Sequence, residues 1–403
     1  MFDPLKIPDF CFCRLLLRWF QPIYIRIFNL NAVDLQNVPC KGPYLIVGNH
    51  SHKLDPFFIG ALIRRPIFQM ASNEYFRIPL MRRFMWAMGA FPIHKDNVRP
   101  RELRHAIEIV QLEYPLAIYP EGGRNWDGKT LPILESTAKM VKLLNRFRTV
   151  PVMAVVSSGN YLAWPRWANR RRKSPVTIHC AEPVTFNERT PVKEIIDWMQ
   201  KAIDHNDNYT NVEKIKGKCP AEGLTRLLWR CPDCRTVEGL IERNGNELVC
   251  TQCCKEWEVN LLCQMREVGT EVWKPIKEYA DLMVRGEEVV PIQPDTTTFI
   301  EENEQVYLQS GVITLYHEPR YPRLKKVDDG RLHLTDRGLV FVKKSNGESI
   351  KYPFKEIRGR STEKNYIFQI GTKERQIARF EMPHESCLKW EIYYDLIKYK
   401  NAD

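Results

Sequence analysis

Short apolar runs alternate with helical patterns between about residues 44 and 203, and this alternation limits the possible folds more than any other feature. The strand-like runs are residues 44–47, 116–119, 150–156 and 176–180. Between them, residues 101–113 and 133–146 repeat apolar side chains at helical spacing. Short buried strands separated by helices are typical of an α/β domain.

Two Cys-x-x-Cys pairs form the most specific local pattern. They are Cys231 with Cys234 and Cys250 with Cys253, and fifteen residues separate them. Two such pairs have the spacing of a four-thiolate zinc ribbon, whereas a thiol redox site usually carries one pair. The pattern therefore predicts a structural zinc, with Cys254 as an alternative to Cys253 for the fourth ligand.

Beyond about residue 306 the chain has the pattern of a β-rich domain. Strand-like segments cover residues 306–316, 331–343, 349–353 and 366–371, with turn signals at 329–330 and 346–347. Leu388, Ile392 and Leu396 then recur every four residues, which predicts a closing amphipathic helix. This architecture resembles a pleckstrin-homology or GRAM-like domain.

These patterns divide the chain into five parts. Residues 285–305 are acidic and contain Pro291 and Pro294, which predicts a linker with little hydrophobic burial. We expect an N-terminal helical segment at 1–32, an α/β domain at 33–218, a zinc ribbon at 219–265, a linker at 266–305 and the β-rich domain at 306–403.

The net charge of +11 comes from a basic excess in residues 1–218, and such a surface attracts nucleic acid or anionic lipid. Near the N-terminus, Arg14, Arg18 and Arg26 would form one stripe on a helix, opposite aromatic and aliphatic residues. This predicts a helix lying in a membrane interface, and a core helix whose arginines reach solvent is the alternative. The arginines also make the segment a poor transmembrane span.

A second aromatic and basic stretch covers residues 161–173. It contains Trp164 and Trp167 and ends in the basic run 170–173. Aromatic residues beside a basic cluster predict a membrane-facing loop. Core tryptophans next to a solvated basic face explain the pattern equally well.

A polar cluster at residues 48–56, Gly-Asn-His-Ser-His-Lys-Leu-Asp-Pro, follows the first strand-like run. A histidine held in one tautomer by a carboxylate can take a proton from an alcohol near neutral pH, and His50 with Asp55 supplies both groups. The two can meet only if His50 lies on the loop and Asp55 begins the helix, which Pro56 favours. The alternative is that Asp55 merely caps the helix and that His50 or His52 is a hydrogen-bonded loop residue.

This cluster resembles the signature of the glycerolipid acyltransferase family, which is a His, four residues and an Asp, usually with Asn before the His. Asn49, His50 and Asp55 match it. Residues 89–95 resemble the second block of the family, with Lys95 where arginine is usual.

The third and fourth blocks follow in order at residues 119–124 and 150–152, with Gly123 where threonine or serine is common. A glycine loop after a strand lets backbone N–H groups approach an oxyanion, while an arginine can grip a phosphate with two donors. The resemblance therefore implies substrate-binding roles for Lys95, Glu121, Gly122, Gly123 and Arg124. The alternative is a plain glycine turn with a solvated arginine.

Taken together, the motifs and the resemblance predict a membrane-surface acyltransferase of phospholipid biosynthesis. It would move an acyl group from acyl-CoA or acyl carrier protein to the free hydroxyl of a lysophospholipid such as 1-acylglycerol-3-phosphate, with His50 as general base and Asp55 orienting it. We expect it at the cytoplasmic face of a membrane, peripheral or monotopic, because the scattered cysteines favour a reducing setting.

The alternative function is a lipid-binding adaptor without turnover, in which the ribbon or the C-terminal domain recruits a protein partner. Nucleic acid fits less well as a partner, because the basic excess lies outside the ribbon.

Overall fold

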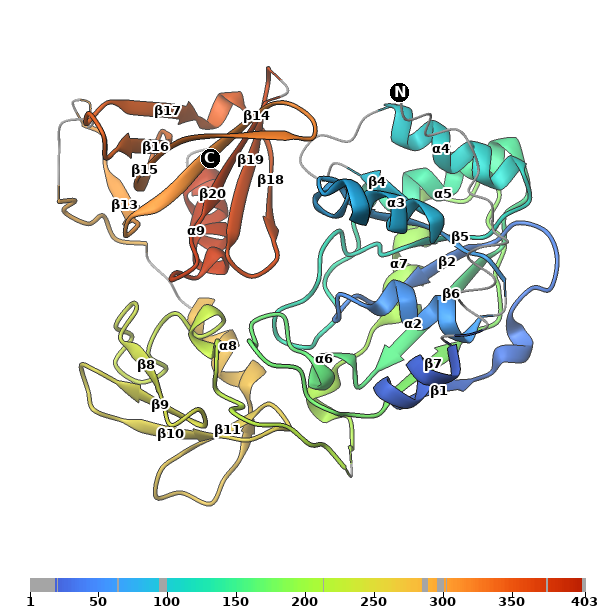
Figure 1. Cartoon of the computed structure of the whole chain (residues 1–403), viewed down its shortest axis with the longest axis horizontal. Helices are drawn as coiled ribbons and strands as arrows, with labels where there is room; N and C mark the ends of the chain where they lie inside the picture. Colours follow the sequence, from blue (N-terminus) through green and yellow to red (C-terminus); the bar gives the residue numbers. More distant parts are fainter. Residues whose placement is uncertain are drawn as a thin grey trace.

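Three sheets follow one another along the chain in the computed structural model, and each carries its own helices (Figure 1). The structure describes residues 19–400, apart from 20, 64, 94–99, 213, 285–288, 296–300, 302 and 375. Among these residues, no helix has both the length and the apolar character needed to span a bilayer.

The first sheet has seven strands in the order β1-β7-β6-β2-β5-β3-β4. The strands are β1 (Leu30–Val33), β2 (Leu45–Gly48), β3 (Phe68–Ser72), β4 (Ala90–Ile93), β5 (Leu116–Ile118), β6 (Val152–Ser158) and β7 (Val176–Cys180). Neighbours are parallel except β6 and β7. The predicted α/β domain is confirmed.

Helices cover both faces of this sheet. They are α2 (Asp55–Leu62), α3 (Pro79–Ala87), α4 (Pro100–Gln111), α5 (Glu135–Phe147), α6 (Asn160–Ala163) and α7 (Val192–Ile203). Leu45 and Val47 pack with α4, α5 and α7, whereas Ile46 between them packs with α2. Because successive strand residues point to opposite faces, this central strand must be apolar throughout.

Strands β3 and β4 lie outside the apolar runs that the sequence pattern picks out. Gln69 and Ser72 interrupt β3, and Pro92 lies within β4. Proline is tolerated there because β4 is the edge strand and its outer side makes no ladder bond. β3 therefore forms through pairing with β5, whose apolar run is clear in the sequence, and β4 forms through pairing with β3.

The second sheet is antiparallel, in the order β12-β11-β10-β9-β8. Its strands are β8 (Leu240–Arg243), β9 (Glu247–Cys250), β10 (Glu256–Val259), β11 (Gln264–Glu267) and β12 (Lys274–Pro275), followed by α8 (Ile276–Val284). The expected linker at 266–305 is therefore wrong in its first part. Ile276 and Met283 are buried in the same apolar cluster as the sheet, which holds α8 against it.

The third sheet is also antiparallel, in the order β17-β16-β15-β14-β20-β19-β18, with β13 beside β15. Its strands are β13 (Val306–Gln309), β14 (Ile313–Arg320), β15 (Arg323–Thr335), β16 (Gly338–Lys343), β17 (Ser349–Pro353), β18 (Ile357–Glu363), β19 (Ile367–Thr372) and β20 (Ile377–Glu381). The closing helix is confirmed as α9 (Cys387–Lys400). The likeness to a pleckstrin-homology or GRAM-like domain stays a prediction.

One of the two expected turns in this domain is wrong. Asn346 and Gly347 do connect β16 to β17, and Gly347 has a left-handed φ of 74°. Gly330, however, lies within β15 and pairs with β14 and β16. A Cβ atom there would lie 2.1 Å from the Val342 carbonyl oxygen, so glycine serves close approach of two strands.

The two candidate membrane segments differ in outcome. Arg14 and Arg18 lie outside the described residues, while residues 21–28 are helical and Ile23 and Ile27 are 55% and 49% exposed. Membrane contact by this helix stays a prediction. The loop at 161–173 is mainly core, since Trp167 is fully buried, and the membrane-facing interpretation is wrong for its aromatic part.

Candidate active site and metal centre

His50 and Asp55 meet where β2 ends and α2 begins. The His50 Nδ1 atom lies 2.9 Å from Asp55 Oδ2. The same oxygen accepts hydrogen bonds from the backbone N–H groups of Ser51, at 3.0 Å, and His52, at 2.9 Å. Asp55 is therefore more than a helix-start residue, because its carboxylate folds the loop that brings the imidazole to it.

Asp55 is completely buried, and its second oxygen accepts a 2.5 Å hydrogen bond from Asn160 Nδ2. Burial raises the pKa of this carboxyl to about 7, although the two backbone donors and the nearby charge of Arg124 act to lower it. A buried carboxylate is costly to keep charged, and the hydrogen bonds from Ser51, His52 and Asn160 offset part of that cost.

Glu121 holds the backbone of the loop that carries His50. Its Oε1 accepts the N–H of His50 at 2.5 Å, and its Oε2 accepts the N–H of Leu131 at 2.7 Å. Burial raises the pKa of this carboxyl to about 8. Both Glu121 oxygens thus accept main-chain hydrogen bonds, and the side chain is buried. Glu121 therefore supports the His50 backbone and is not placed as the substrate-binding residue that we expected.

Two further contacts fix the His50 segment. Asn49 exchanges two hydrogen bonds with the backbone of Ser157 on β6, at 2.9 and 2.7 Å. The His50 ring stacks on Tyr119, with ring centroids 4.3 Å apart and an interplanar angle of 27°. The imidazole is thus oriented with Nδ1 toward Asp55, which places Nε2 on the opposite side of the ring.

His52 has a structural environment. It is 1% exposed, its Nδ1 accepts the N–H of Leu54 at 3.0 Å, and its ring stacks on Phe58. Burial lowers the pKa of His52 to about 4, so the ring is neutral at physiological pH. Of the two histidines in the motif, only His50 contacts the Asp55 side chain through its ring.

The glycine loop after β5 is a tight turn. Gly122 has φ of 70°, its N–H binds the Tyr119 carbonyl at 3.1 Å, and a Cβ atom would lie 2.4 Å from Leu134 Cδ1. Its N–H is therefore committed to the turn and not to an oxyanion. At Gly123 a Cβ atom would meet nothing within 4 Å, so packing does not require glycine there in place of the threonine or serine that is common in the family.

Arg124 extends from this turn and is partly buried. Burial, together with the neighbouring Arg166, lowers the pKa of its guanidinium to about 10, which leaves it charged at neutral pH. Its charge reaches Asp55, His52 and Lys53. Lys95, the second expected anchor, lies outside the described residues.

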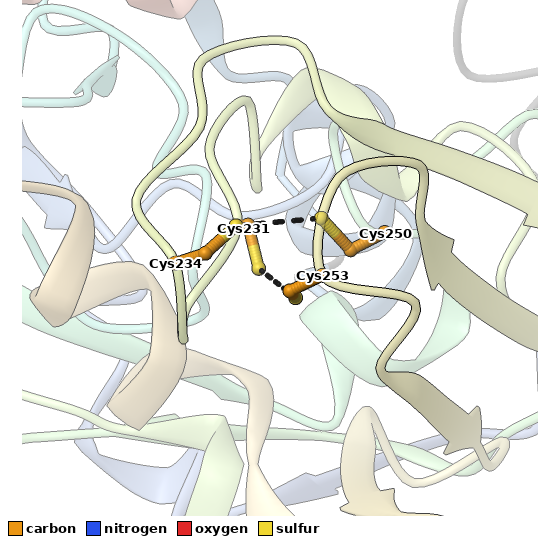
Figure 2. Close-up of side chains that lie close together, drawn as sticks. All are labelled: Cys231, Cys234, Cys250 and Cys253. Atoms are coloured by element: carbon orange, nitrogen blue, oxygen red, sulfur yellow. Dashed lines mark hydrogen bonds between the residues drawn. The ribbon is translucent and has the colours of Figure 1, made fainter.

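The four predicted zinc ligands come together (Figure 2). The Sγ atoms of Cys231, Cys234, Cys250 and Cys253 all lie within 4.8 Å of one another. Four thiolates around a tetrahedral zinc at 2.3 Å would be separated by about 3.8 Å, so the cluster has the size of such a site. Cys254 is exposed and is not part of the group, so Cys253 and not Cys254 completes the cluster.

Comparisons with known proteins concern the first domain. Residues 29–158 match the family model described as Acyltransferase. The chain is 23% identical over 163 residues to a 1-acyl-sn-glycerol-3-phosphate acyltransferase of Limnanthes alba, covering 40% of this chain and 56% of that protein. An enzyme of the same name from Helicobacter pylori is 25% identical over 178 residues, covering 43% and 75%.

The chain thus spans about half the length of the first curated relatives that it matches. Among solved structures, the 1-acyl-sn-glycerophosphate acyltransferase PlsC from Thermotoga maritima has a TM-score of 0.39 and 21% identity, covering 50% of this chain and 82% of that one. The family match includes β2, α2 and the glycine loop. The cysteine cluster and the third sheet lie outside it.

Proposed function

We propose that this chain transfers a fatty acyl group from a thioester to the free hydroxyl of a lysophospholipid of the 1-acylglycerol-3-phosphate type. The observation that carries the proposal is the 2.9 Å contact between His50 and the buried Asp55. The activity for which these relatives are named supports the substrate class. The donor is acyl-CoA or acyl carrier protein.

In the proposed reaction, His50 Nε2 removes the proton of the acceptor hydroxyl as its oxygen attacks the thioester carbonyl. The new C–O bond forms, the C–S bond breaks, and the proton passes from the imidazolium to the leaving thiolate. The Asp55 carboxylate stabilises the imidazolium through the hydrogen bond at Nδ1. Arg124 provides the charge for the acceptor phosphate.

The cysteine cluster would hold a structural zinc. Its four thiolates complete a tetrahedral shell, so the metal would stabilise the second sheet and leave no position for a substrate. Acyl transfer in this proposal uses only the first-domain groups. The zinc therefore matters for folding and not for the transfer step.

The proposal includes a peripheral position at the cytoplasmic face of a membrane, and the apolar surface next to the His50–Asp55 pair supports the membrane contact. Ile78, which precedes α3, and Leu80 on α3 are 61% and 78% exposed, and Phe84 on the same helix is 43% exposed. Phe84 also stacks on Phe57, two residues after Asp55. An apolar surface beside the site gives a lipid substrate a short path from the bilayer.

The test uses the full-length protein, vesicles containing 1-acylglycerol-3-phosphate, and acyl-CoA or acyl carrier protein as donor. Wild type should form diacylated product, and His50→Ala should lower the rate by about 10²–10⁴-fold with folding intact. His50→Ala turnover at the wild-type rate would reject the mechanism. Lipid binding without turnover in the wild type would favour the adaptor function.

Arg124→Ala tests the assigned phosphate anchor. It should chiefly raise the KM for the acceptor, because the His50–Asp55 hydrogen bond joins two other side chains and stays in place. The control is Arg148→Ala, which removes an exposed arginine paired with Glu113. An unchanged acceptor KM with reduced thermal stability would make Arg124 a structural residue.

A further inference from the structure

The third sheet is joined to the first domain by buried ion pairs. Arg77 donates two hydrogen bonds to Glu318 of β14, at 2.8 and 3.0 Å, and Arg379 of β20 pairs with Glu74. The side chains of all four residues are 9% exposed or less. Buried pairs of this kind are costly to break singly, so they fix how the two domains sit against each other.

Apolar packing reinforces the same contact. Tyr321, at the end of the β14–β15 hairpin, packs against the cluster that contains Phe76 and Met85. Its hydroxyl donates to the Asn73 carbonyl at 3.2 Å. The C-terminal domain therefore packs directly against residues 73–85, which follow α2 in the first domain.

Arg166 connects this domain to the glycine loop. Its Nη1 donates to the Arg124 carbonyl at 2.8 Å, and its Nη2 donates to the carbonyl and Oγ1 of Thr362 at 2.8 and 2.7 Å. Its Nε donates to the Lys364 carbonyl at 3.1 Å. The guanidinium is buried and lies over the Trp126 ring, with 4.2 Å from Cζ to the ring centroid.

The turn between β18 and β19 therefore reaches the residue assigned to the acceptor phosphate. The Lys364 carbonyl accepts from Arg166 and also lies 3.5 Å from Arg124 Nη2. The Lys364 side chain turns elsewhere, since its Nζ donates to the Tyr366 hydroxyl at 3.0 Å. The contribution of this turn to the site is thus its backbone.

We propose that the β18–β19 turn of the C-terminal domain forms part of the acceptor site and that Arg166 is a positioning residue for Arg124. Arg166 holds the main chain of Arg124, and the Lys364 carbonyl limits the directions of the Arg124 guanidinium. This proposal rests on the proposed function for the ligand, a lysophospholipid phosphate. It extends the site beyond the residues that the family model matches.

The test compares Arg166→Ala, Arg166→Lys and Thr362→Val with the control Arg170→Ala, which removes an exposed arginine from the same loop. Arg166→Ala should raise the acceptor KM by about tenfold or more, with a smaller change in kcat and an unchanged donor KM, because misplaced binding groups weaken the phosphate contact. Lysine should not restore it, since one ammonium cannot reproduce the four contacts. Thr362→Val should change the acceptor KM in the same direction by a smaller factor.

Acceptor binding is measured separately, with 1-acylglycerol-3-phosphate below its micelle-forming concentration. If wild type binds this lipid but transfers nothing, and Arg166→Ala weakens binding while Arg170→Ala does not, the inference stands and the catalytic proposal fails. If transfer occurs and folded Arg166→Ala and Thr362→Val match Arg170→Ala in acceptor KM and in binding, the inference is overturned. Absence of binding by the wild type overturns it as well. Should Arg166→Ala not fold, Thr362→Val alone decides between these outcomes.

Discussion

Asp55→Asn separates the charge of the Asp55 carboxylate from its hydrogen bonds. In the wild type, Asp55 Oδ2 accepts from Ser51, His52 and His50, while Oδ1 accepts from Asn160. In Asp55→Asn, the amide oxygen can take the place of Oδ2, and the amide NH₂ group can take the place of Oδ1, toward Asn160. Among the described residues, the Asn160 Oδ1 atom is buried without a hydrogen-bond partner. Rotation of the Asn160 amide would turn that oxygen toward the new NH₂ group.

The fold should therefore survive the loss of the charge. Four hydrogen bonds are kept in number, and relief of the buried charge offsets their weakening, so we expect a change in unfolding free energy within about 2 kcal/mol. Catalysis should suffer more. Two unit charges about 4 Å apart interact by about 4 kcal/mol at an effective dielectric of about 20, which corresponds to a fall in kcat of about 10³-fold.

The assay is the initial rate of acyl transfer at saturating acceptor, with thermal unfolding measured on the same preparation. Asp127→Asn is the matched control, since Asp127 is a partly exposed residue of the loop after Arg124 that pairs with Lys277. A rate within tenfold of wild type would refute the electrostatic role of Asp55. Unfolding of Asp55→Asn would refute the amide-rotation argument.

Three further predictions concern pH, metal and the glycine loop. Glu121 has a folded-state pKa of about 8, raised from 4.5, so its contribution to stability is complete below pH 4.5 and is lost as pH rises to about 8. The unfolding free energy of Glu121→Gln, measured with urea, should lack this decline, and a wild type and variant with the same dependence on pH would contradict the prediction. Elemental analysis should find about one zinc per chain in the wild type and in Cys254→Ser. Cys231→Ser/Cys250→Ser should lose the zinc, and limited proteolysis should show that residues 219–275 are no longer folded; a wild type without zinc would contradict the prediction. Gly123→Ser should leave thermal stability close to wild type, because a Cβ atom meets nothing within 4 Å there; a large loss would mean that the turn requires glycine at that position.

The local parts of the candidate site were predictable from the sequence because their partners lie close along the chain. His50 and Asp55 are five residues apart, and one helix start brings them into contact. The cysteine cluster was equally accessible, since thiolate pairs at fixed spacing have few other uses. The chemical roles of these residues stay predictions until the variants are measured.

The supporting contacts could not be predicted in the same way. Glu121 accepts hydrogen bonds from backbone N–H groups, and any residue type except proline can supply such a group, so the sequence does not reveal these partners. Arg166 lies in a stretch whose aromatic and basic composition favoured a membrane loop, but its partners Lys364 and Thr362 are 198 and 196 positions away in the chain. The short strand β3 was missed because its pairing with β5, and not its own composition, makes it extended.

The contact between Arg124 and Lys364 joins residues 240 positions apart in the chain. During synthesis, β2, α2 and the His50–Asp55 contact can form long before the β18–β19 turn leaves the ribosome. A nascent or truncated chain that ends before β18 would therefore carry the His50–Asp55 contact without the Lys364 carbonyl that lies 3.5 Å from Arg124 Nη2. In the full-length chain the proposed acceptor site would be completed last, after the third sheet has folded.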